Sequence, residues 1–590
     1  MDNLAARLHR HVPALAALLL GLVVTGPLMA RGFVLAYDMV FVPNPRLSLA
    51  LLGLSRTLPR SVPTGFVVAS ASKLLTGQVV QKLILIGIFA GAAYGAARLV
   101  PARRASARVA AGMLYAWNPF LYERLLFGHW TLLLAYAAMP WVAGAALEYR
   151  RGVPRAWARL ALALAAAVAT GPYGGLFGAV VAMAIALFPP GGLKGRRGAA
   201  VVAMAVAINL PWLVPGLLHQ PVPGRPALAL ELFRARSDSS LGLMGSLVSL
   251  GGLWRTDLAP PGRHGLAWIP AFCLIAVVSL WGWRELRTRL PVGAVRGLAT
   301  LAALGLIAAI APSVHLVAPL VRWASRALPG GAIFRDSQKY VIPLALLESV
   351  AFGAGVERIL GRVRSDERAA LGAALLLPLL PLALAPTLAW GAGGRLSPVS
   401  YPPSWEQAEA VMARDSVPGA VLAFPWHAYL PFGWNHDRTV RQPAAQYFSR
   451  PVVADSSLQV GPYRLPAEDP WSRMSTGVVV GRGPLETGLA RLGVRYVLLY
   501  KEADWRPRLP RLAGLRVVLE THDLVLYQAP PPVRVPTFAE PPIVAVLAAD
   551  AVALALVLGA GAALMGARRP AGGPVILQPG DHHGVRSVGE

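Results

Sequence analysis

Charged side chains are scarce in this chain of 590 residues. Asp, Glu, Lys and Arg make up 14% of it, whereas 55% of the residues are hydrophobic. In soluble globular proteins about a quarter of the residues are charged. Runs of about 18 or more apolar residues recur along the chain, and each can cross a hydrocarbon core of about 30 Å. The composition therefore predicts a polytopic α-helical membrane protein and excludes a soluble enzyme.

Cysteine is almost absent. The single cysteine, Cys273, lies in an apolar segment, so neither an intrachain disulfide nor a cysteine cluster for a metal can form. The formal charge of +27 would suggest a nucleic-acid partner in a soluble protein. Here the arginines cluster between apolar segments, where such residues set the topology of a membrane protein. We therefore expect no nucleic-acid partner.

Twelve apolar segments are candidate membrane spans. They cover residues 12–30, 82–100, 108–120, 130–147, 158–171, 174–188, 198–216, 266–282, 297–316, 340–356, 369–389 and 542–566. Basic clusters separate alternate segments, and the positive-inside rule places these clusters in the cytoplasm. The pattern predicts a multi-pass protein of the cell membrane with about 12 spans and with both termini cytoplasmic.

The region before the last segment has a different composition, with 16 Lys/Arg nearly balanced by 13 Asp/Glu. Apolar runs of period two alternate there with helix-like stretches, and proline pairs flank the region. We expect a small mixed α/β domain outside the membrane. The predicted organisation is a multi-span domain at 1–389, an extracytoplasmic domain at 390–540, a final transmembrane helix at 541–567, and a disordered cytoplasmic tail at 568–590.

Few carboxylates remain as candidates for chemistry. Of the 29 acidic residues, 13 lie in the α/β region, and others lie in the tails or among the cytoplasmic arginines. Eight are left: Asp38, Glu123, Glu231, Asp238, Asp257, Asp336, Glu348 and Asp550. The acids at 231, 238 and 257 belong to a polar loop, where a surface position is expected. Those at 348 and 550 lie within spans, where a carboxylate is costly and faces a cavity or a partner.

Two short segments combine charge with aromatic residues at a membrane edge. In the first, Asn118-Pro119 breaks a helix and is followed by Glu123, Arg124 and His129. Irregular backbone at this depth must be buried in protein or line a wet cavity. An aromatic belt accounts for the tryptophans and tyrosines of this segment but not for the charged residues.

The second segment, Phe334-Arg-Asp-Ser-Gln-Lys-Tyr340, places two cations four residues apart on the outer side. A phosphate partner would explain them, because Arg binds phosphate bidentately and Lys supplies a point charge. The alternative is a surface ion pair of Asp336 with Arg335 or with Lys339.

These features together resemble the GT-C superfamily of polyprenyl-phosphate-sugar glycosyltransferases, which have many spans and an acid in the first outer loop. The Trp-Asn-Pro-Phe and Gly-His-Trp motifs within 117–130 and the Arg-Asp-x-x-Lys-Tyr segment at 335–340 are similar to actinobacterial arabinofuranosyltransferase-like membrane proteins. The strands expected at 496–500 and 524–527 are similar to YfhO-type membrane proteins.

The resemblance implies roles for the candidate residues. Asp38 would act as general base on an acceptor hydroxyl while the sugar leaves a lipid phosphate. Asp38 is followed by Met39 rather than by a second acid, so Glu123 is the candidate for the second catalytic carboxylate. The implied substrate and phosphate site consists of Arg124, His129, Arg335, Asp336 and Lys339.

The implied function is transfer of a sugar from a polyprenyl-phosphate donor to an envelope glycan or glycolipid acceptor on the outer face of the membrane. The expected partners are this donor, the acceptor and membrane lipids. No metal ligands are assigned, and a requirement for a divalent cation is left open. Two alternatives remain: a transporter or flippase for a lipid-linked glycan, and a non-catalytic GT-C-like scaffold for cell-envelope assembly.

Overall fold

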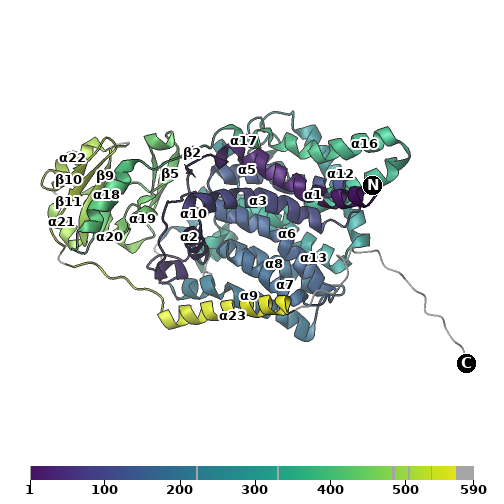
Figure 1. The fold of residues 1–590 in the computed structure, drawn as a ribbon, viewed down its shortest axis with the longest axis horizontal. Helices are drawn as coiled ribbons and strands as arrows, with labels where there is room; N and C mark the ends of the chain where they lie inside the picture. Colours follow the sequence, from purple (N-terminus) through teal and green to yellow (C-terminus); the bar gives the residue numbers. More distant parts are fainter. Residues whose placement is uncertain are drawn as a thin grey trace, which may run out of the picture.

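The computed structural model describes residues 2–566, except 221–223, 328–330, 482–484, 503–504 and 533. A bundle of apolar helices forms one part of the molecule, and an α/β unit adjoins one end of the bundle (Figure 1). The predicted tail at 568–590 lies outside the described residues.

All twelve predicted spans are helical. Within the described ranges, nine helical segments are long and apolar enough to cross a membrane. They contain α1 (Asp2–Thr25), α3 (Gly77–Leu99), α6 (Trp130–Arg150), α9 (Gly195–Leu218), α12 (Ile269–Arg289), α13 (Val292–Ile310), α15 (Ile342–Arg362), α16 (Glu367–Leu376) and α23 (Ile543–Met565). The other three predicted segments match the shorter helices α4 (Ala105–Ala116), α7 (Ala156–Val168) and α8 (Pro172–Leu187).

The predicted break at Asn118-Pro119 is confirmed. Helix α4 ends at Ala116, and α5 (Pro119–Leu126) begins with the proline at its first position, where a missing N–H costs nothing. The side chain of Asn118 caps α5 by accepting a hydrogen bond from the backbone N of Leu121 at 3.2 Å. The break turns the chain into a short buried helix that carries Glu123 and Arg124.

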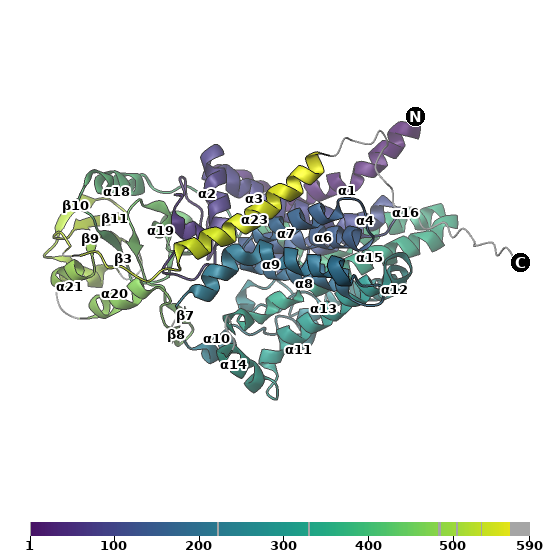
Figure 2. The same cartoon turned by 90° about the horizontal axis from the view of Figure 1, so that it is seen from below.

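The basic loops lie together at the end of the bundle away from the α/β unit. Arg104 pairs with Glu357 at 3.1 Å, and Arg289 donates to the carbonyl of Pro101 at 3.1 Å. Helix α1 begins at this end, and α23 runs from the α/β unit along α9 and α7 toward it (Figures 1 and 2). The helix order therefore puts the arginine clusters on one side and the α/β unit on the other.

The α/β unit is built on a mixed sheet of order β10-β11-β9-β3-β6. Its strands are β3 (Ala420–Phe424), β6 (Val452–Val453), β9 (Val494–Tyr500), β10 (Arg516–Glu520) and β11 (Leu524–Gln528). Strand β3 is parallel to both neighbours, whereas β11 is antiparallel to β9 and β10. The expected mixed α/β domain is confirmed, with α18 (Pro403–Arg414), α20 (Pro470–Val480) and α21 (Glu486–Arg491) packed around the sheet.

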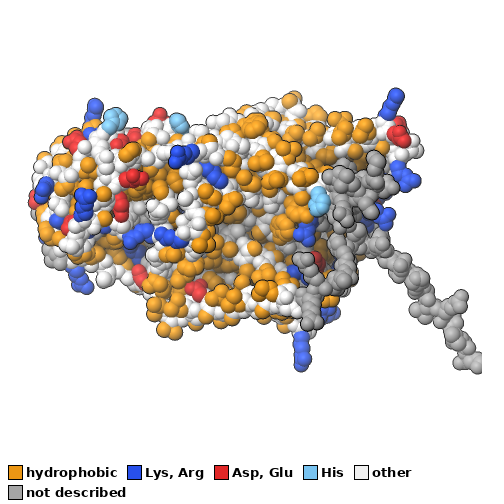
Figure 3. Space-filling model, in the orientation of Figure 1, with side chains coloured by type: hydrophobic (Ala, Val, Ile, Leu, Met, Phe, Trp, Pro, Cys, Tyr) orange, Lys and Arg blue, Asp and Glu red, His pale blue; other side chains and the backbone are white. Residues whose placement is uncertain are grey.

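Short strands join the unit to the bundle. Strand β1 (Phe33–Val34), just after α1, pairs antiparallel with β2 (Pro398–Val399). The hairpin of β4 (Tyr429–Pro431) and β5 (Thr439–Arg441) reaches the same loop. On the face that Figure 3 shows, hydrophobic side chains predominate on the bundle, and charged ones are frequent on the α/β unit. The first loop after α1 thus lies at the junction of an apolar and a polar body.

Candidate active site at the junction of the bundle and the α/β unit

The loop that carries Asp38 is fixed by backbone hydrogen bonds on two sides. The N–H of Tyr37 donates to the carbonyl of Thr439 at 2.7 Å, and the N–H of Arg441 donates to the carbonyl of Tyr37 at 2.9 Å. The N–H of Asp38 donates to the carbonyl of Phe127 at 3.4 Å. Residues from the first loop, from the loop after α5 and from the α/β unit therefore meet at Asp38.

Gly128 permits this close approach. Its φ is +72°, and a Cβ there would lie 2.1 Å from the carbonyl O of Ala36 and 2.4 Å from the N of Met39. Both contacts are with backbone, so no side-chain rotation could relieve them. The Gly-His-Trp motif therefore brings His129 next to Asp38 because its first residue lacks a side chain.

The carboxylate of Asp38 is held at both oxygens. Tyr429 Oη donates to Oδ1 at 2.7 Å, and Nε2 of His129 lies 3.4 Å from Oδ2. The side chain keeps 34% of its surface exposed. Burial opposes ionisation, but His129, Arg441 and Tyr429 outweigh it and lower the pKa of Asp38 to about 2. Asp38 is consequently an ionised, partly accessible carboxylate at neutral pH.

His129 connects Asp38 to a second acid through Arg124. Arg124 makes a bidentate ion pair with Asp336, at 2.5 and 2.9 Å, and its Nη1 lies 2.8 Å from Nδ1 of His129. A guanidinium only donates, so Nδ1 must accept and the imidazole proton sits on Nε2, toward Asp38. The four side chains therefore form a row in space, in the order Asp336, Arg124, His129 and Asp38. Each of them is oriented by its neighbour.

Asp336 takes a left-handed backbone conformation, with φ 59°, at the start of the 3-10 turn Ser337–Val341. Burial disfavours its charged form, but Arg124, Lys339 and His129 hold its pKa below the ordinary value. Its partner is Arg124 from a distant segment. Neither surface ion pair that the sequence suggested as the alternative to a phosphate site is the main contact of Asp336.

Glu123 lies behind this row and is fully buried. Its Oε2 accepts from Nε2 of Gln338 at 2.5 Å and from the backbone N of Leu253 at 3.3 Å. Gln338 in turn accepts a hydrogen bond from Nε of Arg124 at 3.0 Å. Glu123 thus touches the site only through Gln338 and Arg124.

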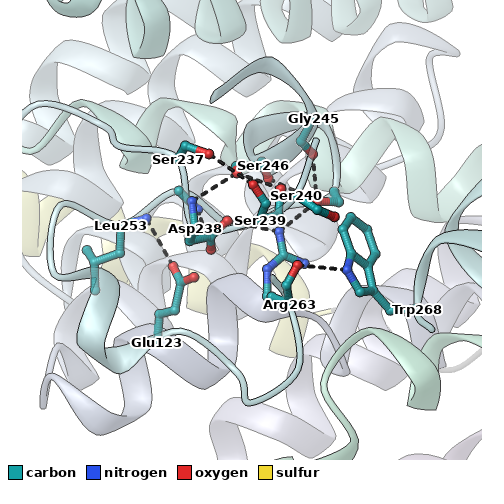
Figure 4. Close-up of polar contacts among 12 residues, drawn as sticks. Glu123, Ser237, Asp238, Ser239, Ser240, Gly245, Ser246, Leu253, Arg263 and Trp268 are labelled. Atoms are coloured by element: carbon teal, nitrogen blue, oxygen red, sulfur yellow. Dashed lines mark hydrogen bonds and ion pairs between the residues drawn. The ribbon is translucent and has the colours of Figure 1, made fainter. Parts of the chain in front are cut away.

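A second buried acid faces Glu123 (Figure 4). Asp238 pairs with Arg263 at 3.1 Å and accepts from the N–H of Gly252 at 2.9 Å. Burial and the neighbouring charge and hydrogen bond of Asp238 raise the pKa of Glu123 well above its usual range, whereas Asp238, despite its burial, keeps a lowered pKa through Glu123 and Arg263. Of the two carboxyls, Glu123 is therefore the one whose neutral form is favoured. The expected surface position of Asp238 was wrong, because this network makes burial of its charge tolerable.

The predicted cations Arg335 and Lys339 lie on the other side of the site. Lys339 is fully buried, with its Nζ 3.3 Å from Oη of Tyr173 and 4.5 Å from the centre of that ring. Arg335 is 3.7 Å from Glu468 of the α/β unit. Glu468 also pairs with Arg60 at 2.7 Å. Both ion pairs of Glu468 link the bundle and the first loop to the α/β unit.

Four residues of the site were not found from the sequence: Arg60, Tyr429, Arg441 and Glu468. Arg441 acts electrostatically on both Asp38 and Glu468. Counted together, the site residues named so far hold five Arg or Lys side chains, at 60, 124, 335, 339 and 441, against three ionised acids, Asp38, Asp336 and Glu468. The junction therefore has an excess of positive charge beside an ionised carboxylate. No local pattern marks these residues: Tyr429, Arg441 and Glu468 reach the site through the docking of the α/β unit, and Arg60 of the first loop pairs there with Glu468.

Within the described residues, no group of three or more His, Cys, Asp or Glu side chains is placed to hold a metal ion. Among the other acids considered, Asp257 pairs with Arg255 at 2.6 Å, and Glu231 is exposed on α10 (Pro226–Leu232). Glu348 and Asp550 are half-buried on α15 and α23. None of these four lies in the row from Asp336 to Asp38.

The architecture defines the class of fold. The apolar bundle, the first loop that carries Asp38 and the α/β unit before the last apolar helix have the GT-C-like fold of the solved structure named next. A solved structure with this fold is "Arabinofuranosyltransferase AftD from Mycobacteria", which is 17% identical, with a TM-score of 0.60 over 88% of this chain and 40% of that chain. A mutant of the same enzyme gives 18% identity and a TM-score of 0.56, over 88% of this chain and 41% of that chain.

This chain spans about 40% of the length of the AftD chain that it matches. At this identity the likeness shows the fold alone. No family model matches the chain. No curated protein matches it either.

Proposed function

We propose that the protein transfers a sugar from a polyprenyl-phosphate donor to a glycan or glycolipid acceptor at the end of the bundle that carries the α/β unit. The observation that carries the proposal is the ionised Asp38 beside an excess of cations in an accessible junction. A hydroxyl acceptor needs a carboxylate within hydrogen-bond reach. A departing lipid phosphate needs cations near its oxygens.

In the proposed reaction, the acceptor hydroxyl oxygen attacks the anomeric carbon of the donor sugar. The bond from that carbon to the phosphate oxygen breaks, and its electron pair leaves with the lipid phosphate. The hydroxyl proton passes to Asp38. A carboxylate with a pKa of about 2 is a weak base, so Asp38 orients the hydroxyl first and takes the proton late. The acceptor replaces Tyr429 on Oδ1, which restores basicity when it is needed.

Arg335 and Lys339, with Arg60 and Arg441 at the rim, are proposed to bind the phosphate. Arg335 and Arg60 share the single carboxylate of Glu468. One carboxylate cannot neutralise two guanidiniums, so they retain the capacity to bind a further anion. Glu123 is proposed to position Arg124 through Gln338 rather than to react, because it is buried and its pKa is raised.

The same proposal orients the protein in the membrane. The arginine-rich end of the bundle would face the cytoplasm, in accordance with the positive-inside rule. The α/β unit and Asp38 would then face outward, and α1 and α23 would have their far ends inside. This orientation suits a donor that is carried in the outer leaflet.

The test is sugar transfer by the purified protein in lipid vesicles, offered a panel of polyprenyl-phosphate sugars. Asp38→Asn should lower the rate by about 10²- to 10⁴-fold, the usual contribution of a general base. Glu520→Gln, which removes an exposed carboxylate on β10, is the matched control and should transfer normally. Equal transfer by the Asp38 variant would refute the role of Asp38. Movement of intact lipid-linked sugar across the vesicle without transfer would favour the transporter alternative.

A further inference from the structure

Helix α14 (Ala318–Ala327) has three distinct faces. Ala318 and Ser325 are buried against the protein. A second face, together with the residue just before the helix, exposes Leu316 at 90%, Leu320 at 63% and Trp323 at 62%. Arg322 lies between these two faces by helical spacing. A basic stripe beside an exposed apolar stripe is the pattern of a helix that lies in a membrane interface.

The position of α14 agrees with that pattern. It follows the end of α13, one of the helices long enough to span a membrane, and the exposed Leu304 and Ile307 continue the apolar surface down α13. α14 lies beside α10 at one edge of the molecule (Figure 2). Both helices belong to the end of the bundle that carries Asp38, because Ser313 donates to the carbonyl of Ala235 at 3.1 Å and Ser337 accepts from the N–H of Ala235 at 3.0 Å.

An open hollow of about 190 Å³ separates α10 from α14. Its polar lining consists of Glu231, Arg234, Ser313, His315 and Arg322. In the part of the chain that the structure describes, neither arginine has a carboxylate at ion-pair distance, and Glu231 has no cationic partner at that distance. The two arginines and Glu231 together carry a net charge of +1, which an anion could balance.

We propose that this hollow binds the headgroup of an anionic phospholipid. Its phosphodiester, with a single negative charge, would lie between Arg234 and Arg322, both of which can bind phosphate oxygens bidentately. Glu231 would accept hydrogen bonds from headgroup hydroxyls such as those of phosphatidylglycerol. The acyl chains would follow the exposed apolar face formed by Leu316, Leu320 and Trp323.

The positive charge of the hollow and its position next to the apolar stripe favour a lipid over a second copy of the chain or a free phosphate. A second copy of the chain would bury the apolar stripe but would leave the two arginines unpaired. A free phosphate would pair with the arginines but would make no contact with the apolar stripe. Only an amphipathic anion satisfies both adjacent stripes. This site is separate from the row that contains Asp38, so its test does not depend on glycosyl transfer.

The experiment is native mass spectrometry of the purified protein in detergent, titrated with phosphatidylglycerol or phosphatidylcholine. The wild-type protein should retain phosphatidylglycerol in preference to phosphatidylcholine. The double variant Arg234→Gln/Arg322→Gln should bind it at least about tenfold more weakly, since each charge-assisted contact is worth a tenfold change or more. Arg326→Gln removes an equal charge from the same helix without touching the hollow and should bind as the wild type does.

Three results would overturn the proposal. These are undiminished phosphatidylglycerol binding by the double variant, equal binding of the two lipids by the wild type, and displacement of the lipid by millimolar inorganic phosphate. A wild-type dimer that is lost in Leu320→Ser/Trp323→Ser would assign the face to a second copy instead. Arg322→Gln alone, at an exposed position, provides a variant that should fold normally, and a retained melting temperature in the same detergent checks this.

Discussion

Tyr429 of the α/β unit donates a hydrogen bond of 2.7 Å to Oδ1 of Asp38, 391 positions earlier in the chain. The two residues belong to different bodies of the molecule, and the contact forms only when the bodies are docked. Tyr429 therefore does two things: it lowers the basicity of Asp38, and it occupies the place at which an acceptor hydroxyl would bind.

Tyr429→Phe should separate these effects. Above about pH 4 the carboxylate of Asp38 is ionised in both proteins, so transfer at neutral pH should stay within about threefold of the wild type. The acid limb of the rate profile should rise by about one pH unit, because the variant lacks a hydrogen bond that stabilises the ionised form. A loss as large as that of Asp38→Asn would instead make Tyr429 part of the chemistry.

The same pKa gives a prediction for stability. Because the pKa of Asp38 is lowered to about 2 from 3.8, its ionised form stabilises the folded protein above about pH 4. This contribution is lost as the pH falls from about 4 to about 2. Thermal unfolding of Asp38→Asn should therefore show a weaker dependence on pH in that range than the wild type, and an identical dependence would contradict the assignment.

Gly128→Ala should damage the site without changing any polar group. The added Cβ would meet backbone at 2.1 and 2.4 Å, and φ is +72°. Strain of this kind costs about 1–3 kcal/mol, and the loop that carries Asp38 must move away. Transfer should fall by at least about tenfold, because positioning errors near 1 Å cost about that or more. Gly477→Ala on α20, where nothing lies within 4 Å, is the control and should transfer normally.

Much of the architecture could be predicted because membrane spans and amphipathic strands are determined by the local sequence, through runs of apolar residues. The helix break at Asn118 and the strands of the α/β unit are of this kind. The candidate residues Asp38, Arg124, His129 and Asp336 were also visible as polar groups in apolar surroundings. The order of these residues in space, with Arg124 between Asp336 and His129, could not be predicted, because it depends on segments more than 200 positions apart.

Three of the residues missed by sequence reasoning share one cause. Tyr429, Arg441 and Glu468 lie in a domain of ordinary polar composition, where a Tyr or an Arg is not exceptional. Only the pairing of β5 with the loop at Tyr37 brings them to Asp38. The buried pair of Glu123 and Asp238 was missed for a related reason: two acids far apart in sequence give no sign that they face each other.

Arg335→Gln should weaken donor binding more than it slows the chemical step. Arg335 lies 3.7 Å from Glu468, which also binds Arg60 at 2.7 Å, so loss of one guanidinium removes charge from the phosphate site and leaves the fold intact. KM for a polyprenyl-phosphate sugar should rise by about tenfold, as for one charge-assisted contact. Arg464→Gln, a cation of the α/β unit paired with Asp455, is the matched control. An unchanged KM in the Arg335 variant would remove it from the phosphate site.

Glu123→Gln and Glu123→Ala distinguish a positioning residue from a second catalytic carboxylate. Glu123 is fully buried and its raised pKa favours the neutral form, which glutamine matches in shape and charge. Glu123→Gln should therefore transfer within a few-fold of the wild type. Alanine leaves Gln338 and the N–H of Leu253 without an acceptor, and should cost about 1–3 kcal/mol of stability together with most of the activity.

The pH dependence of stability sharpens this comparison. An acid whose pKa is raised by folding destabilises the folded state progressively as the pH rises above its unfolded value of about 4.5. Glu123→Gln has no proton to lose, so its stability relative to the wild type should increase between about pH 5 and pH 8, as measured by thermal unfolding in detergent. If Glu123→Gln were instead as inactive as Asp38→Asn while melting at the wild-type temperature, Glu123 would be a reacting carboxylate, and its burial would have to be relieved when the substrates bind.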